Sequence, residues 1–351
     1  MASRTITIES QKGKFFIREF QPEDLSGCLD SWKAAFGKEM DKNLWEWKYF
    51  KSPGGFRTVV CVSEDGTVAV HYAGQGNRSF YFDKEILGLQ LIDIYSHPSF
   101  RWAIGGKTGL FVKTARSFWQ TFMDNAPFDK GLDLFSKQKR GQFVWGLPGI
   151  RHARLGQKVI KYGRLPDAFF AKSQIKKRQN LKGNLLYSLN RVIPSNDKMP
   201  RGLDRLWSRF LTKCKPFCII KDKAHVKWRF WQCPKAQEHS YRFYLLKRPW
   251  SSAPLAWLAV ATVDNRNMIL DFLAVSEKDL ARIVGMCIME EDQPLEVWLS
   301  ETDPLCQVFL QLGFLKEPEP LGIVPSMQSF CLGIMDKTDS FHWLMGDSDL
   351  F

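Results

Sequence analysis

The chain has 351 residues, of which 44% are hydrophobic, 14% aromatic and 25% charged, and its formal net charge is +13. This length exceeds what one compact core usually holds, so we expect two domains of about 150 residues each. The longest apolar run, residues 253–263, is too short to cross a membrane, and the first residues lack the apolar stretch of a signal peptide. The excess of positive charge favours anionic ligands without selecting among them.

Eight cysteines are scattered through the chain without a C-x-x-C pair. The sequence therefore lacks the spacing of a zinc or iron–sulfur site, and we predict no metal. Cysteines in apolar surroundings are typical of reduced core residues, which predicts a cytoplasmic protein. No helix-turn-helix, zinc-finger or RNA-binding sheet motif is found, so the sequence does not predict a nucleic-acid partner.

A strand, a glycine loop and a helix are predicted between residues 87 and 122. Residues 89–95 (LQLIDIY) are apolar and partly β-branched, which is typical of a buried strand, and apolar residues recur at helical spacing over 111–122. The loop between them contains Gly105, Gly106, Lys107, Thr108 and Gly109. A glycine loop that opens a helix presents free backbone N–H groups, which predicts a phosphate site. An ordinary turn between strand and helix is the plain alternative.

Two kinds of phosphate loop fit this segment differently. The nucleotide P-loop, G-x-x-x-x-G-K-[ST], matches at Gly106-Lys107-Thr108, but Arg101 stands where its first glycine belongs. A side chain at that position obstructs the tight curl of the loop. The other kind of loop is the acyl-CoA loop of an acyltransferase family.

Several segments resemble the GNAT N-acetyltransferases. Residues 93–101 (DIYSHPSFR) resemble the strand ending of that family, and residues 106–111 (GKTGLF) resemble its acyl-CoA loop. Residues 16–24 resemble its first strand and turn, and residues 145–149 (WGLPG) resemble its "G-[FL]-P" element. The chain departs from the pattern by about four extra residues before the loop and by Phe111, where the family has Gly or Ala.

The two halves of the chain also resemble each other. WKYFKSP at 47–53 returns as WRFWQCP at 228–234, and a predicted strand pair follows each. LQLIDIY has a counterpart in MILDFLAV at 268–275, in which Asp271 matches Asp93. Self-similarity at a period of about 180 residues indicates duplicated domains.

The predicted fold class is α/β, because strands alternate with helices. With the resemblance, it becomes two tandem GNAT-type domains, each a mixed, mostly antiparallel central sheet flanked by helices. We expect the domains at 13–170 and 201–335, a basic linker at 171–200 and a C-terminal tail at 336–351. The charge of the linker is either a solvated surface or a contact for an anionic partner.

The resemblance implies acyl-CoA-dependent N-acyl transfer, most simply from acetyl-CoA to an amine of a small molecule or peptide. In that fold the backbone of the fourth strand binds pantetheine, and the matching positions are Ile94, Tyr95 and Ser96. The pyrophosphate is then expected against the loop and the start of the helix: Gly105, Gly106, Lys107, Thr108, Gly109, Leu110 and Lys113.

Acyl transfer to an amine needs groups that move protons at the nitrogen and at the leaving thiolate. Asp93 and Tyr95 share one face of the strand by period-two alternation, and His97 follows them. We predict these three as candidate catalytic residues. The alternatives are that Asp93 is a structural carboxylate, as Asp271 suggests, and that His97 is a turn residue. Gln157 stands where the family frequently has a tyrosine acid.

The second half lacks the glycine loop. Residues 276–279 (SEKD) follow its strand in a capping-box pattern, and their acidic side chains repel phosphate. We therefore predict an acyl-CoA site in the first domain only. Two further hypotheses remain: a catalytically silent GNAT fold that binds an acyl-CoA or a protein, and a Fem-like aminoacyl transferase that uses charged tRNA.

Overall fold

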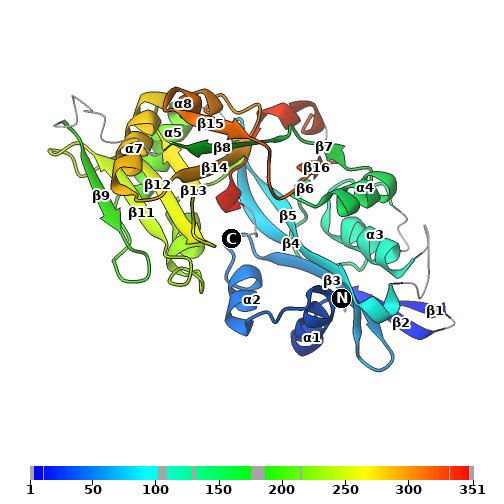
Figure 1. Ribbon diagram of the computed structural model, residues 1–351. Coiled ribbons are helices and arrows are strands. Elements are labelled where there is room, and N and C mark those ends of the chain that lie inside the picture. The colour runs from blue at the N-terminus through cyan, green and yellow to red at the C-terminus, as the bar shows by residue number, and fades with distance from the viewer. Residues whose placement is uncertain are drawn as a thin grey trace. The chain divides into compact units, whose positions relative to one another are not determined.

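A computed structural model describes seven stretches of the chain, which form two units (Figure 1): 4–10, 12–101, 109–128, 132–174, 186–213, 216–331 and 333–347. Unit 1 comprises residues 1–78, 86–164 and 326–337, and unit 2 comprises 79–85, 165–325 and 338–351. The predicted phosphate-binding residues Gly105, Gly106, Lys107 and Thr108 lie outside the described residues. Within those stretches no helix is both long and apolar enough to cross a membrane.

Unit 1 is built on a sheet with the strand order β1-β2-β3-β4-β5-β6-β16-β7. Its strands are β1 Ile6–Ser10, β2 Gly13–Glu19, β3 Phe56–Ser63, β4 Val68–Tyr81, β5 Lys84–Ser96, β6 Phe143–Gly146, β7 Gly163–Arg164 and β16 Ser326–Gln328. Its helices are η1 Pro22–Asp24, α1 Leu25–Phe36, α2 Lys42–Tyr49, η2 Pro98–Phe100, α3 Leu110–Phe122 and α4 Ile150–Val159.

Strand β3 shows why this sheet carries helices on both faces. Val59 and Cys61 belong to the core cluster that contains α3 residues, whereas Val60 and Val62 belong to the cluster that contains α1 and α2 residues. Successive side chains of a strand point to opposite faces, so a continuous apolar run is buried on both sides. The run TVVCV therefore requires a helical layer on each face.

Unit 2 is built on a second sheet with the strand order β15-β8-β14-β13-β12-β11-β9. The strands of this sheet are β8 Ala168–Ser173, β9 Ser188–Val192, β11 Arg242–Lys247, β12 Pro254–Val263, β13 Arg266–Ala274, β14 Leu295–Ser300 and β15 Phe314–Glu317. Unit 2 also contains β10 Phe217–Ile219 and β17 Phe341–His342, which pair with each other outside this sheet. Its helices are α5 Leu203–Lys213, α6 Lys223–Val226, η6 Lys227–Trp231, α7 Glu277–Glu290, α8 Cys306–Gln311 and η8 Met345–Asp347, and η7 Met335–Ser340 contains the change between the units.

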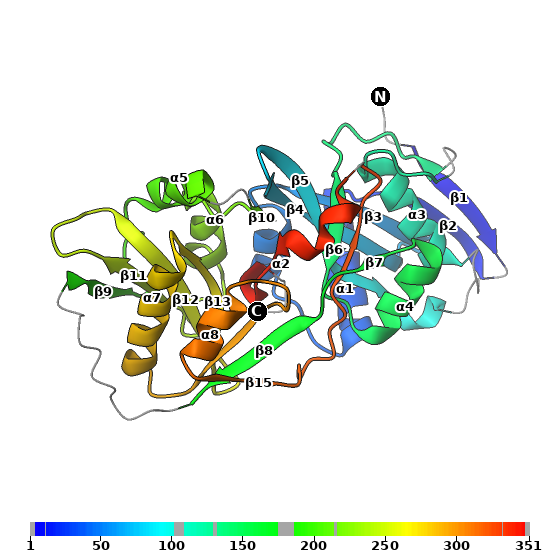
Figure 2. The same cartoon turned by 90° about the horizontal axis from the view of Figure 1, so that it is seen from above.

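The second sheet is also covered on both faces. Tyr244 and Leu258 pack in one cluster with residues of α7 and α8, and Figure 2 shows these helices along the sheet. On the opposite face the rings of Phe243 and Trp257 stack at 5.1 Å, and Phe230 of η6 packs against both. The repeated aromatic heptamer therefore supplies a covering turn in unit 2, as its residue Tyr49 of α2 does in unit 1.

In each sheet a parallel ladder covers only part of the longer of its two strands. The ladder between β5 and β6 runs from Gly88 to Gln90, while β5 continues to Ser96. The ladder between β13 and β14 runs from Asn267 to Ile269, while β13 continues to Ala274. Both sheets are otherwise mostly antiparallel, as the sequence predicted.

The structure differs from the predicted division of the chain in two places. Within the predicted linker, β8 ends at Ser173 and β9 covers Ser188–Val192, and both strands belong to the sheet of unit 2. Within the predicted tail, Trp343 and Met345 are fully buried, because apolar residues alternate there among the acidic ones. The cysteines that the structure describes are free thiols.

The predicted helix cap at Ser276 should contribute measurably to the free energy of unfolding. The Ser276 Oγ accepts a hydrogen bond from the Asp279 N–H at 3.2 Å and donates one to the Asp279 carboxylate at 2.7 Å. We expect Ser276→Ala to lower the free energy of unfolding by about 1 kcal/mol, as measured by urea denaturation. Ser208→Ala, at an exposed position of α5, is the control and should change it little. Equal effects from the two variants would contradict the cap.

Candidate functional site

The open part of β5 in unit 1 carries the residues predicted to bind pantetheine. Ile94, Tyr95 and Ser96 lie beyond the end of the ladder with β6. Helix α3 begins at Leu110 after Gly109, which is extended at φ −60° and ψ 159°, and the Lys113 N–H closes its first turn on the Gly109 carbonyl at 3.0 Å. The first N–H groups of a helix have no partner inside it and favour an anion.

Asp93 interrupts β5 just before these residues. Its φ is +46°, in the left-handed region that non-glycine residues rarely adopt. Leu91 and Ile94 pack toward the α3 side, whereas Ile92 packs toward the α1 and α2 side. Asp93 is therefore an extra residue in the alternation, which is the definition of a β-bulge, and it bends the strand.

The Asp93 carboxylate is fully engaged by helix α2. Its Oδ1 accepts from the Lys48 Nζ at 2.9 Å, and its Oδ2 accepts from the Tyr49 hydroxyl at 2.9 Å. The two charged side chains are 4% and 7% exposed, for Asp93 and Lys48 respectively. A buried ion pair is retained where both partners are hydrogen-bonded, and removal of either one leaves an uncompensated charge.

His71 of β4 fixes the backbone of the same bulge. Its Nδ1 donates to the Asp93 carbonyl at 2.8 Å, because a carbonyl can only accept. The ring stacks on Tyr95 with centroids 5.0 Å apart. Complete burial lowers the pKa of His71 to about 4 from its usual 6.5, so the imidazole is neutral at pH 7.

Tyr95 and His97 have different surroundings. The Tyr95 hydroxyl donates to the Cys28 carbonyl of α1 at 2.7 Å, and burial raises the pKa of Tyr95 well above its usual value. His97 is half-buried and begins η2, where its Nδ1 accepts from the Ser99 N–H at 3.2 Å. The neutral His97 ring therefore carries its proton on Nε2.

The structure thus brings Asp93 and Tyr95 against the helices α2 and α1, and it places His97 at the end of the strand. Sequence reasoning missed the partners Lys48, Tyr49 and His71. Lys48 and Tyr49 lie in the aromatic heptamer that recurs in the second half, and this recurrence is the signal that could have found them. No sequence pattern marks His71.

Unit 2 repeats the arrangement with other partners. The register of β13 on β12 shifts between Ala259 and Val260, which leaves Leu270 as an extra residue next to Asp271. Asp271 is bound by Lys221. A cavity of about 320 Å³ lies beside the open part of β13, with residues 272–276, the start of α7 and residues 303–305 in its wall. Its wall is mainly apolar.

The structure was compared with those of known proteins. No family model matches this sequence, and no curated protein matches it. Similar solved structures include an Enterococcus faecalis protein described as a probable N-acyltransferase (TM-score 0.61, 10% identity, 89% of this chain and 71% of that chain). A GCN5-related N-acetyltransferase from Anabaena variabilis matches with a TM-score of 0.60 and 10% identity, over 89% of this chain and 72% of that chain. N-myristoyltransferase from Saccharomyces cerevisiae matches with a TM-score of 0.52 and 9% identity, over 89% of this chain and 79% of that chain.

Such low identities establish the fold alone. The chain has the fold of the GCN5-related N-acetyltransferases, or GNAT superfamily, over most of its length. This confirms the predicted fold class, two mostly antiparallel sheets flanked by helices.

The buried His71 predicts a defined pH dependence of stability. The folded state keeps His71 neutral down to pH about 4, whereas the unfolded chain binds a proton below pH about 6.5. The contribution of His71 to the free energy of unfolding is therefore fully present above pH 6.5. It decreases by about 3 kcal/mol as the pH falls toward 4.

The variant His71→Gln should remove this part of the pH dependence. Urea denaturation of both proteins between pH 4 and 8 measures it, and the difference between their unfolding free energies should shrink as the pH falls. A constant difference over that range would mean that His71 is not held neutral in the folded state.

Proposed function

We propose that the protein is an acyl-CoA-dependent N-acyltransferase whose acyl-CoA site is the open edge of β5 and the start of α3 in unit 1. One observation supports the proposal: β5 ends its ladder with β6 at Gln90, is bent at Asp93 and continues through Ile94, Tyr95 and Ser96, the residues that the resemblance assigns to pantetheine. The solved N-myristoyltransferase with bound myristoyl-CoA shares this fold. The simplest donor is acetyl-CoA, and the acceptor is an amine of a small molecule or a peptide.

The strand supplies binding and polarisation. Backbone groups of Ile94, Tyr95 and Ser96 pair with the amides of pantetheine, and an N–H there polarises the thioester carbonyl. Gly109, Leu110 and Lys113 receive the pyrophosphate at the helix start, together with Gly105, Gly106, Lys107 and Thr108.

The side chains divide into positioning and reacting groups. Asp93 and Tyr95 are positioning residues in this scheme, because their polar atoms already bind Lys48, Tyr49 and the Cys28 carbonyl. The neutral amine attacks the carbonyl carbon, a C–N bond forms, the C–S bond breaks, and the amine proton passes to solvent. The Nε2–H of His97 is the donor assigned to the leaving sulfur.

The acyl-CoA site can be tested with two matched glycine variants. Gly109 and Gly149 precede α3 and α4 of the same unit, and their backbone angles are nearly equal, at −60°/159° and −66°/161°. Aspartate is a favourable residue at such a position, and because Gly109 is buried whereas Gly149 is exposed, circular dichroism must show that each variant is folded. Only Gly109→Asp places a carboxylate against the proposed pyrophosphate.

We expect acetyl-CoA at 100 times its Kd to stabilise the wild type and Gly149→Asp by about 2.7 kcal/mol and to leave Gly109→Asp unchanged. Thermal unfolding with and without the ligand measures this. Equal stabilisation of both variants by acetyl-CoA would contradict a pyrophosphate site at the start of α3.

The role of His97 can be tested by His97→Gln. A hydrogen bond to a charged group contributes about 1.5–3 kcal/mol, so we expect turnover to fall about 10- to 100-fold, with stabilisation by acetyl-CoA intact. Thiol release with an amine acceptor measures turnover, and His342→Gln in unit 2 is the control. Unchanged turnover in His97→Gln would contradict the assignment.

A binding function without catalysis is the second candidate, because the side chains of both Asp93 and Tyr95 are already engaged. Stabilisation by acyl-CoA without thiol release across an amine panel favours it. The Fem-like alternative, motivated by the tandem arrangement and by the basic residues around 171–201, predicts no stabilisation by any acyl-CoA and binding of charged tRNA.

A further inference from the structure

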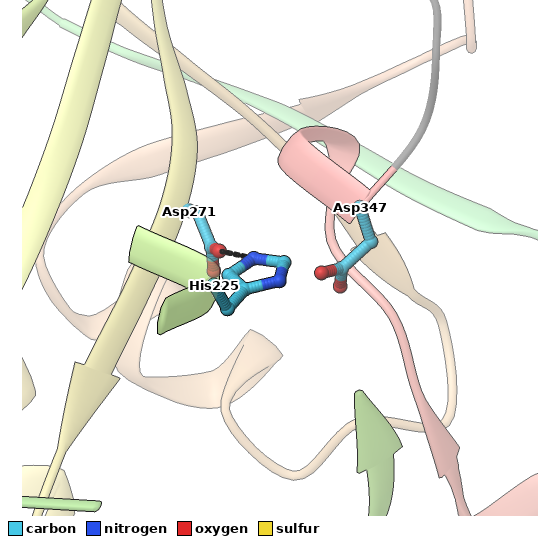
Figure 3. A group of neighbouring side chains, drawn as sticks. All are labelled: His225, Asp271 and Asp347. Carbon is cyan, nitrogen blue, oxygen red and sulfur yellow. Dashed lines mark ion pairs between the residues drawn. The ribbon is translucent and has the colours of Figure 1, made fainter. Parts of the chain in front are cut away.

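Three buried side chains of unit 2 converge on one point (Figure 3). They are His225 of α6, Asp271 of β13 and Asp347 of η8, and they are 7%, 0% and 5% exposed. One ligand atom from each lies within 4.8 Å of the others. Figure 3 shows the His225 ring between the two carboxylates.

Local structure holds each group in place. The Asp222 side chain accepts from the His225 N–H at 3.0 Å and so begins α6. A Cβ at Gly346 would lie 2.6 Å from the Leu270 carbonyl oxygen, so only glycine lets η8 approach β13 this closely. Buried Arg229 donates to the Gly346 carbonyl at 2.7 Å. This contact places Asp347 beside Asp271.

Lys221 uses only half of the carboxylate oxygens. Its Nζ binds the Asp271 Oδ1, and it binds the Asp347 Oδ2 at 3.2 Å. The remaining atoms, Asp271 Oδ2, Asp347 Oδ1 and His225 Nε2, are buried and have no hydrogen-bond partner among the described residues. The Nε2 lies 3.8 Å from the Asp271 Oδ2. Buried polar atoms normally have a partner, so these three require one.

The charges of these four groups do not balance when both carboxylates are ionised. Two carboxylates and one ammonium then leave one negative charge if His225 is neutral. An unpaired charge in a protein interior costs several kcal/mol. A cation that contacts the three open atoms would oppose the excess negative charge and would supply the missing contacts.

We propose that His225, Asp271 and Asp347 bind a divalent transition-metal ion of the zinc or manganese class. One imidazole nitrogen and two carboxylate oxygens suit such ions, and water completes the coordination. Lys221 then holds the outer oxygens of both carboxylates and orients them, as outer partners of metal ligands commonly do. The proposal departs from the sequence-based prediction of no metal, because these ligands come from three separate segments and form no recognisable motif.

The first test titrates the metal-free full chain with Zn²⁺ by calorimetry. We expect one equivalent to bind and the melting temperature to rise, since an ion that binds the folded state stabilises it. His225→Gln should lose this equivalent, and it leaves the Lys221 contacts in place. His342→Gln is the control, because His342 forms a separate histidine–aspartate pair in this unit, with Asp303 at 2.8 Å, and should keep the equivalent. Circular dichroism confirms that each variant is folded.

Two outcomes overturn the proposal: no Zn²⁺ or Mn²⁺ binding to the wild type at millimolar concentration, or an equivalent that persists in His225→Gln. If the wild type binds no metal and is stabilised as the pH falls from 7 to 5, the missing cation is a proton. Co²⁺ gives a check that needs no variant, because its visible absorption reports nitrogen and oxygen ligands at the bound ion.

Lys221→Met provides a second, independent test. Without the ammonium, the two carboxylates repel each other, so the metal-free variant should melt well below the wild type. A bound Zn²⁺ should then raise its melting temperature by more than it raises that of the wild type. A variant that Zn²⁺ does not stabilise would show that the lysine alone organises the cluster and would overturn the proposal.

Discussion

The buried contact between an aspartate and a lysine at the bulge of one strand is the constraint on which each unit depends. In unit 1 the contact joins Asp93 to Lys48 and ties β5 to α2. A left-handed residue in a strand costs about 1–3 kcal/mol and persists only where its surroundings hold it. Lys48, Tyr49 and His71 together hold Asp93 through both oxygens and its carbonyl. The bend that they maintain lies in the part of β5 beyond its ladder with β6, directly before Ile94.

The two units apply this constraint with different charges. In unit 1 one lysine balances one aspartate, and both carboxylate oxygens have partners. In unit 2 a second carboxylate, Asp347, shares the lysine, and burial raises its pKa while Lys221 lowers that of Asp271. The matching aspartates therefore differ: both carboxylate oxygens of Asp93 have hydrogen-bond partners, whereas the Oδ2 of Asp271 has none among the described residues. This difference is consistent with a role in shaping the strand for Asp93 and with the proposed ion-binding role for Asp271.

The sequence predicted what depends on local pattern. Period-two runs and the repeated heptamer gave the two sheets, and the matching Asp93 and Asp271 marked the bulged strands. The bulge itself was not predictable from alternation: Asp93 and Tyr95 both contact the α1 and α2 side only because the extra residue shifts the parity after Ile92. The partners Lys48, His71 and Asp347 lie far away in the chain, and only the folded sheet brings them to the aspartates. The acidic residues of the C-terminal segment led to its prediction as a tail, although Phe341, Trp343 and Met345 are core residues.

The two units also differ in the residues at which the helices α3 and α7 begin. Gly109 opens α3 with a residue that has no side chain, whereas Ser276 opens α7 with its own hydroxyl acceptor and with Glu277 and Asp279 in the first turn. A helix start that is already satisfied by serine and surrounded by carboxylates disfavours an anion, and one that begins at glycine leaves its N–H groups available. The apolar cavity beside β13 therefore suits an uncharged ligand group better than a pyrophosphate. Both units contain the bulged strand, and we expect the residue at the following helix start to decide which ligand chemistry that strand can face.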